Sequence, residues 1–137
     1  MAALLTGPDR QKCKVSSTLN RSSEFSSKNM FVEGDNCWNS DQGQNQYISL
    51  DFLREVEITK LCVTFQGGFV GQDCVVKCGP SLKEMEDVET IYPDDTNDCQ
   101  EFPMQCSGRC FTILFPYSTD FYGRVTVYSL EVYGTEI

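Results

Sequence analysis

The chain has 137 residues, of which 20 are Asp or Glu and 11 are Lys or Arg, so its formal net charge at pH 7 is −9. This length suffices for one compact domain that buries its own hydrophobic core without a metal or disulfide staple. Phosphate backbones and anionic lipid surfaces are held by clustered basic side chains, and the nearest such cluster, Arg10–Lys14, is short. The composition therefore argues against nucleic-acid-binding and membrane-surface proteins, and we expect neither partner.

The amino-terminal stretch MAALLTGPDRQKCK has only a brief apolar patch, whereas a secretory signal needs roughly 7–15 apolar residues in a row. No stretch approaches the ~18 apolar residues of a membrane-spanning helix. We therefore expect an intracellular, soluble protein whose eight cysteines do not form a disulfide framework.

Two C-x3-C pairs raise the question of a zinc site. Cys74 with Cys78 and Cys106 with Cys110 could supply four thiolates, which hold structural zinc in tetrahedral geometry. Paired ligands in such sites usually have two residues between them, and the chain has no histidine to assist. Core or incidental thiols are the favoured interpretation, and zinc is the alternative.

Five segments have the pattern of short β-strands. From Tyr47 to Phe52, apolar and polar residues alternate, which is typical of a strand with one buried face. In the second segment and the last one the apolar parity changes midway, which predicts β-bulges near Thr59–Lys60 and near Tyr128. The predicted strands span residues 47–52, 56–65, 88–92, 110–115 and the closing run GRVTVYSLEVYG.

Long amphipathic helical patterns are absent from the sequence. Ser81-Leu82-Lys83-Glu84 has the form of a capping box for a single helical turn. Gly, Pro and Asp clusters separate the strands, with no crossover helices between them. The sequence thus predicts one all-β domain over residues 1–137, with its core at about 14–134, folded as an antiparallel sandwich.

The usual groups of an enzyme are missing. The sequence contains no histidine, no G-x-S-x-G elbow, no phosphate-binding loop and no dinucleotide fingerprint. We therefore expect a non-catalytic protein, with a metal-dependent hydrolase or zinc protein as a weaker alternative. The one loop with ligand character is Glu33-Gly34-Asp35-Asn36, whose hard oxygens suit Ca²⁺. An ordinary acidic turn is the alternative interpretation of that loop.

A family resemblance rests on three strings: FVEGDNCWNSDQGQNQYISLDF, VEITKLCVTFQGGF and FYGRVTVYSLEVYG. They resemble the discoidin, or coagulation factor C-type, branch of the galactose-binding-like fold, over about residues 14–134. The resemblance implies a jelly-roll β-sandwich with Trp38 packed inside it. It also implies a structural calcium held by Glu33, Asp35 and Glu131, while Cys37 departs from the threonine common in the family. No cofactor is otherwise required.

In this fold, binding falls on loops at one end of the sandwich. The segments 20–28, 66–73 and 104–109 are the candidate loops, with Arg21, Gln66, Phe69, Val70 and Arg109 as candidate contact residues. Phe69 and Val70 lie between glycines, so we expect both side chains to be exposed at a projecting tip and to anchor a partner.

The strings CWNSDQG, FQGGF and TDFYGRV narrow the resemblance to a family of small intracellular proteins that associate with an orphan nuclear receptor. This implies a protein-interaction module that represses transcription, is nuclear or also cytoplasmic, and is a monomer. The alternative is a carbohydrate-binding module that uses Phe69, Arg21 and Arg109 for a sugar.

Overall fold

The computed structural model describes residues 2–137, which form antiparallel strands and short 3-10 helices. None of the helices within these residues is long and apolar enough to cross a membrane. The strands are β1 (Ala3–Leu4), β2 (Lys12–Val15), β3 (Trp38–Asn39), β4 (Gln46–Phe65), β5 (Gly71–Gln72), β6 (Cys74–Ser81), β7 (Glu84–Ile91), β8 (Cys99–Phe115), β9 (Tyr117–Ser118) and β10 (Thr126–Glu136). The helices are η1 (Leu19–Arg21), η2 (Ser23–Phe25) and η3 (Ser27–Phe31).

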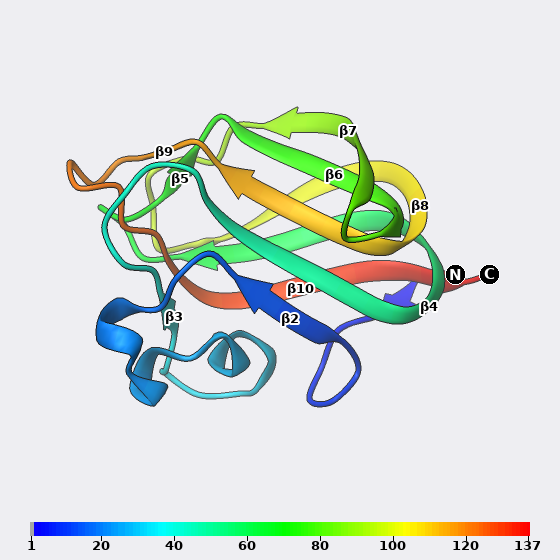
Figure 1. Ribbon diagram of the computed structural model, residues 1–137, viewed down its shortest axis with the longest axis horizontal. Coiled ribbons are helices and arrows are strands. Elements are labelled where there is room, and N and C mark those ends of the chain that lie inside the picture. The colour runs from blue at the N-terminus through cyan, green and yellow to red at the C-terminus, as the bar shows by residue number, and fades with distance from the viewer. Residues whose placement is uncertain (1) are drawn as a thin grey trace.

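Two long, bent strands carry both layers of the sandwich. The first part of β4, up to Asp51, pairs with the last part of β8, and its second part, from Val56, pairs with the first part of β8. Between the two parts Leu53 adopts a left-handed backbone conformation, with φ of 64°, where the strand turns. The strand order β1-β10-β4-β8-β6-β7 therefore folds over on itself (Figure 1). This confirms the predicted antiparallel jelly-roll sandwich.

Both predicted bulges are present. The β4–β8 register shifts between Ile58 and Lys60, and the β4–β10 register shifts between Val127 and Ser129. Each shift returns the apolar residues on its far side to the interior. The buried apolar residues of these two strands are Val56, Ile58, Leu61, Val63 and Phe65 in β4, and Val127, Leu130 and Val132 in β10.

The predicted helical turn at Ser81–Glu84 is wrong. These residues form the tight turn between β6 and β7, and Ser81 pairs with Glu84 as the last step of the ladder. The Glu84 N–H donates to Ser81 Oγ at 3.2 Å. The side chain thus makes the contact of a helix cap, but strand pairing on both sides leaves no room for a helix. The strand expected at 88–92 begins earlier, at Glu84, and ends at Ile91.

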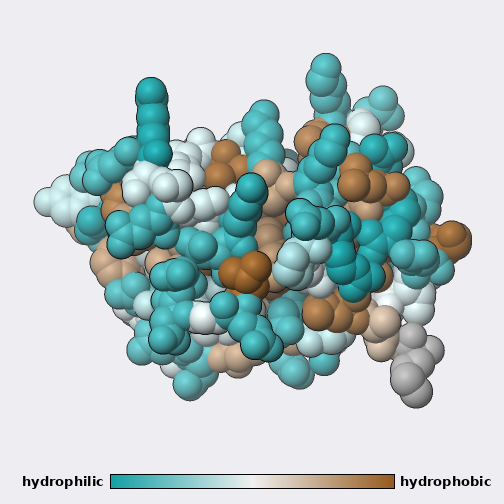
Figure 2. Space-filling model, turned by 90° about the horizontal axis from the view of Figure 1, so that it is seen from below, coloured by the Kyte–Doolittle hydropathy of each residue, from teal (hydrophilic) through white to brown (hydrophobic). Residues whose placement is uncertain are grey.

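The sandwich has two unlike ends (Figure 1). The loop end is made by the connections 40–45, 66–70, 92–98 and 116–124. The turn end is made by the bends at 53–55, 81–84 and 105–109, together with the final residues of β10. The helix η3 packs against β10 and buries Met30. On the face that Figure 2 shows, hydrophobic residues gather only in small groups among hydrophilic ones.

Candidate functional site

Trp38 belongs to the core, as the resemblance implies. Its side chain is 0% exposed, its ring centroid lies 6.5 Å from that of Phe115, and its Nε1–H donates to the Ser17 carbonyl at 3.0 Å. The amide-rich loop around it satisfies its own polar groups, because the buried Gln46 Nε2 donates to the carbonyls of Asp41 and Gly43. These contacts give the corner a structural role.

The expectation that Val70 is exposed is wrong. Its side chain is 0% exposed, whereas that of Phe69 is half-buried. The Val70 N–H donates to Thr119 Oγ1 at 3.0 Å, and the Val70 carbonyl accepts from the Thr119 N–H at 2.9 Å. These bonds lead into the small β5–β9 ribbon, and alternation along an extended chain then turns Val70 inward when Phe69 points outward.

The most exposed aromatic side chain, that of Phe121, lies on a neighbouring loop next to Tyr122. Phe121 is 93% exposed and Tyr122 is 56% exposed, and their rings meet edge-to-face with centroids 5.3 Å apart. The guanidinium of Arg124 lies 5.2 Å from the ring centroid of Phe69 and 5.7 Å from that of Tyr122. We call the group of Phe69, Phe121, Tyr122 and Arg124 the aromatic tip.

The backbone under the aromatic tip is firmly held. Asp120 accepts hydrogen bonds from the Arg124 N–H and Nε–H at 3.1 and 2.9 Å. The hydrogen bond from Arg124 is the main reason that the pKa of Asp120 lies below its usual value, and the same contact raises the pKa of Arg124. Gly123 has a φ of 84°, and a Cβ there would lie 2.4 Å from the Gly43 carbonyl oxygen. The backbone of the loop is therefore closely packed, although the rings of Phe121 and Tyr122 are exposed to solvent.

The other predicted contact residues do not form one site. Gln66 is half-buried and its Oε1 accepts from the Tyr128 hydroxyl at 3.3 Å. Arg21 is exposed on η1, beside a serine-rich pocket. Arg109 lies at the turn end, where its guanidinium donates to both carboxylate oxygens of Asp51 at 2.9 and 3.2 Å. Arg109 therefore lies at the opposite end of the sandwich from Gln66 and Phe69, and Figure 1 shows the two ends.

The carboxylates of the implied calcium set are not assembled. Glu33 and Asp35 are exposed in their loop, and among residues 2–137 they form no group of three ligand atoms within 4.8 Å with Glu131. The Glu131 carboxylate instead lies close to the thiols of Cys62 and Cys99, and it accepts a hydrogen bond from the Tyr133 hydroxyl at 3.3 Å. Glu33 and Glu131 line the same pocket, but the three carboxylates do not converge on one point, so the calcium site stays a prediction.

Within residues 2–137, the thiols of the two C-x3-C pairs do not gather three ligand atoms within 4.8 Å of one another. In a strand, residues four apart are separated by about 13 Å, so the two thiols of one pair cannot reach one ion. Cys74, Cys78 and Cys110 are buried, and Cys106 packs against the core. All eight cysteines are free. The positions of Cys74, Cys78 and Cys110 agree with the favoured interpretation as core thiols.

The sequence interpretation overlooked Phe121 and Tyr122, although it used the string that contains them. The signal was available, because two adjacent aromatics precede Gly123 in a stretch without strand alternation. The grouping of Cys62, Cys99 and Glu131 had no local signal, since it depends on the register of three strands.

Comparisons with known proteins agree with this architecture. No family model matches the chain. Among solved structures, CpGH89CBM32-5 from Clostridium perfringens, in complex with GalNAc-β-1,3-galactose, superposes with a TM-score of 0.79 at 13% identity, covering 95% of this chain and 99% of that one. Chitosan-binding module 1 from a Paenibacillus sp. IK-5 chitosanase/glucanase superposes with a TM-score of 0.80 at 14% identity, covering 96% and 99%. These neighbours share the fold.

Curated relatives are much more similar in sequence. The nuclear receptor 2C2-associated protein of Mus musculus is 40% identical over 138 residues, which cover 98% of this chain and 97% of the relative. The protein of the same name from Danio rerio is 38% identical over 125 residues, covering 88% and 89%. At this identity and coverage, the chain belongs to the family of nuclear receptor 2C2-associated proteins.

Proposed function

We propose that this protein is a non-catalytic interaction module that binds a nuclear receptor through the aromatic tip and represses the receptor's transcriptional activity. The observation that carries the proposal is the Phe121 side chain, 93% exposed on a loop whose backbone is held in place. Soluble proteins leave large rings in water at a cost, and such rings commonly anchor a partner. The names of the curated relatives indicate the class of partner.

The chemistry of the aromatic tip suits a protein groove. Aromatic rings and arginine contribute most to the energy of protein interfaces, because aromatic rings bury large areas with few rotatable bonds and the planar guanidinium makes several hydrogen bonds at once. Here the loop is already fixed by the Gly43 N–H, which donates to the Tyr122 carbonyl at 2.8 Å, and by the Asp120–Arg124 ion pair. Binding would therefore order little backbone, which lowers its entropic cost. The chain's net charge of −9 favours a neutral or basic surface on the partner.

The charges at the tip support a binding role over a catalytic one. A general acid or base works best when its pKa lies near the working pH. The contact between the two side chains moves both pKa values away from neutral pH: it lowers the pKa of Asp120 and raises that of Arg124. Neither group is suited to exchange protons near neutral pH. A protein that acts by occupying a receptor surface in the nucleus, as a monomer, needs no such group.

Titration calorimetry with purified nuclear receptor 2C2 tests the proposal. The double variant F121S/Y122S should lose at least tenfold in affinity, because truncating interface anchors commonly costs more than 1 kcal/mol each. Its thermal stability should stay near that of the wild type, because both side chains are exposed. The matched control is Leu82→Ser, which removes a 43% exposed apolar side chain at the turn end. Absence of binding by the wild type, or equal losses in both variants, contradicts the proposal.

A carbohydrate is the second candidate ligand. Exposed rings beside a guanidinium can stack on a sugar and donate to its hydroxyl groups, and two structural neighbours have sugar-binding names. A glycan array with the wild type and F121S/Y122S distinguishes the candidates. Specific hits that disappear in the variant, together with no affinity for the receptor, would favour the sugar.

A further inference from the structure

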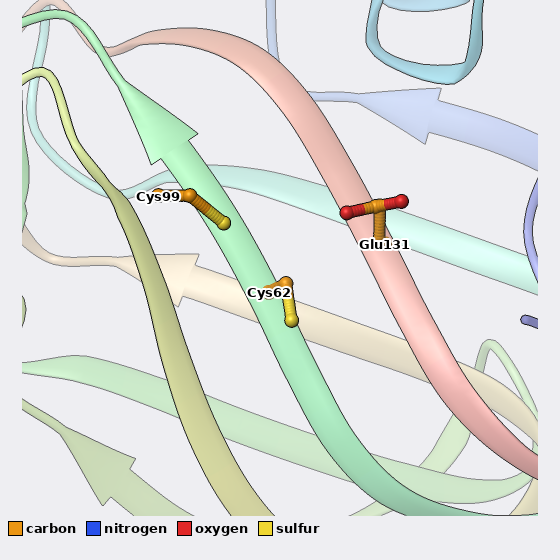
Figure 3. Close-up of side chains that lie close together, drawn as sticks. All are labelled: Cys62, Cys99 and Glu131. Carbon is orange, nitrogen blue, oxygen red and sulfur yellow. The ribbon is translucent and has the colours of Figure 1, made fainter. Parts of the chain in front are cut away.

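We propose that Cys62, Cys99 and Glu131 form a zinc-binding site on the outer face of the β10-β4-β8 sheet. One ligand atom from each residue, a thiol sulfur or a carboxylate oxygen, lies within 4.8 Å of the other two. It is the only such group of three among His, Cys, Asp and Glu in the part of the chain that the structure describes. Figure 3 shows the three side chains, which come from neighbouring strands.

Strand register brings the three residues together. Glu131 on β10 lies opposite Cys62 on β4, and Cys99 on β8 lies opposite Thr64, one diagonal step from Cys62. All three side chains point away from the core, because the alternate residues Leu61, Val63, Leu130 and Val132 are buried inside. Three hydrogen-bonded strands thus fix the ligands in a way that a loop would not.

The spacing suits zinc. With Zn–S of about 2.3 Å and Zn–O of about 2.0–2.2 Å, tetrahedral ligand atoms lie roughly 3.5–3.8 Å apart. The three atoms could contract from their present separation to this value by small rotations of the side chains. Two sulfurs and one carboxylate select zinc over calcium, which prefers oxygen ligands only. The fourth position is left for water or for a donor from a partner.

The residues around the three ligands also favour metal binding. Cys62 is 4% exposed and Cys99 is exposed, so the site is sheltered on one side and open to an incoming ion on the other. Tyr133 donates to Glu131 Oε2, which orients the carboxylate and leaves Oε1 for the ion. The nearby cation, Lys60, is already engaged by Glu101 at 3.6 Å and by the Tyr133 ring at 4.5 Å from its centroid.

Zinc at this position would also steady the loop end. Cys99 is the first residue of β8, and it directly follows the 92–98 connection. In that connection, Asn97 Oδ1 and Asp95 Oδ1 accept from the N–H groups of Gly67 and Gly68 at 2.6 and 2.8 Å. An ion that ties Cys99 to β4 and β10 would therefore restrain the segment that supports Phe69.

Titration of the fully reduced protein with zinc, in competition with a chromophoric chelator, tests the site. The wild type should bind one equivalent, and its cobalt form should show thiolate-to-metal charge transfer and the visible bands of tetrahedral Co²⁺. Cys99→Ser and Glu131→Gln should each weaken binding at least tenfold. The control Cys37→Ser removes a half-buried thiol outside the group and should bind as the wild type does. Zinc should raise the melting temperature of the wild type and the control, but not that of the two ligand variants.

Several results would overturn the proposal. They are the absence of zinc binding by the reduced wild type, unchanged affinity in both ligand variants, or loss of binding in Cys37→Ser. Circular dichroism without zinc checks that each variant is folded. Should Cys99→Ser fail that check, Glu131→Gln decides, because it keeps the size of the side chain and replaces the carboxylate with a neutral amide, which is a much weaker zinc ligand.

Discussion

The two ends of the sandwich are closed in different ways. At the turn end, backbone packs directly on backbone: a Cβ on Gly79 would lie 1.9 Å from the Glu84 carbonyl oxygen, and one on Gly134 would lie 1.8 Å from that of Glu57. At the loop end, backbone meets backbone at Gly123 and Gly43, and side chains such as Asn97 and Asp120 also hold the connections through hydrogen bonds to backbone N–H groups. Close packing therefore restricts Gly79 and Gly134 at the turn end, whereas an exposed residue such as Phe121 at the loop end can change while the hydrogen-bonded loop keeps its shape. This difference is our reason for placing binding at the loop end.

The largest expected effect concerns the support beneath the loop end. Trp38→Ala should lower the free energy of unfolding by about 3–5 kcal/mol, since it opens a large cavity beside Phe115. It also removes the hydrogen bond from Nε1 to the Ser17 carbonyl. Urea denaturation measures the change. A loss below ~1 kcal/mol would mean that the loop end is built independently of the core, and the comparison of the two ends would fail.

A pair of glycine substitutions compares the ends directly. Gly79→Ala at the turn end should cost about 2–3 kcal/mol, because the new methyl group forces β6 and β7 apart. At the loop end, the methyl group of Gly68→Ala would have no atom within 4 Å. Only the unfavourable φ of 89° should lower the free energy of unfolding, by about 1–2 kcal/mol. Chemical denaturation of both variants under one condition gives the difference. Equal costs would show that conformational preference, and not packing, sets the tolerance of each end.

The sequence predicted the strands and bulges of the sandwich better than the exposure of residues in its loops. Burial on one face of a strand produces period-two alternation, as around Ile48 and Leu50, and a bulge produces a change of parity, as near Thr59 and Tyr128. Strands and bulges could therefore be inferred from the sequence. The exposure of loop residues produces no such regular pattern in the sequence. Val70 was expected outside because glycines flank it, yet its placement depends on hydrogen bonds to Thr119, far along the chain.

The sequence also predicted the candidate sites poorly, because their residues come together through contacts between distant parts of the chain. Glu131 was identified as a ligand through the family resemblance, but the partners beside it, Cys62 and Cys99, come from two other strands. Their proximity follows from strand register, which a single sequence does not specify. Arg109 was likewise grouped with the binding loops, although the bend of β8 places it at the opposite end.

Serine substitutions at Phe69 and Val70 sharpen the comparison within one loop. Val70→Ser should lower the free energy of unfolding by about 2 kcal/mol, because it replaces a fully buried apolar side chain. Phe69→Ser should cost less, since its ring is half-buried and its main recorded contact is the Arg124 guanidinium. Thermal melts of the two single variants distinguish them. A larger loss for Phe69→Ser would show that the aromatic tip is part of the core.

The smallest expected effect is a difference in acid sensitivity between the ends. Hydrogen bonds from Arg124 lower the pKa of Asp120 at the loop end, and those from Arg109 lower the pKa of Asp51 at the turn end. A carboxylate with a lowered pKa in the folded state stabilises the protein above its unfolded pKa of about 3.9, and this stability is lost as the pH falls through the folded value. The stability gap between the wild type and Asp120→Asn should therefore be constant above about pH 5 and shrink below about pH 4.

Asp51→Asn is the matched variant, because Asp51 and Asp120 each accept from one arginine and one backbone N–H. The turn-end pair is more exposed, with side chains 47% and 18% accessible for Arg109 and Asp51, against 30% and 11% for Arg124 and Asp120. Solvent and salt screen exposed pairs more strongly, so the gap for Asp51→Asn should have the same sign and a smaller size. Urea titrations of all three proteins across this pH range measure both gaps. A larger gap for Asp51→Asn would mean that the Asp120–Arg124 pair stabilises the protein less than the Asp51–Arg109 pair does. The ion pair beneath the aromatic tip could then no longer be used to explain why that loop is rigid.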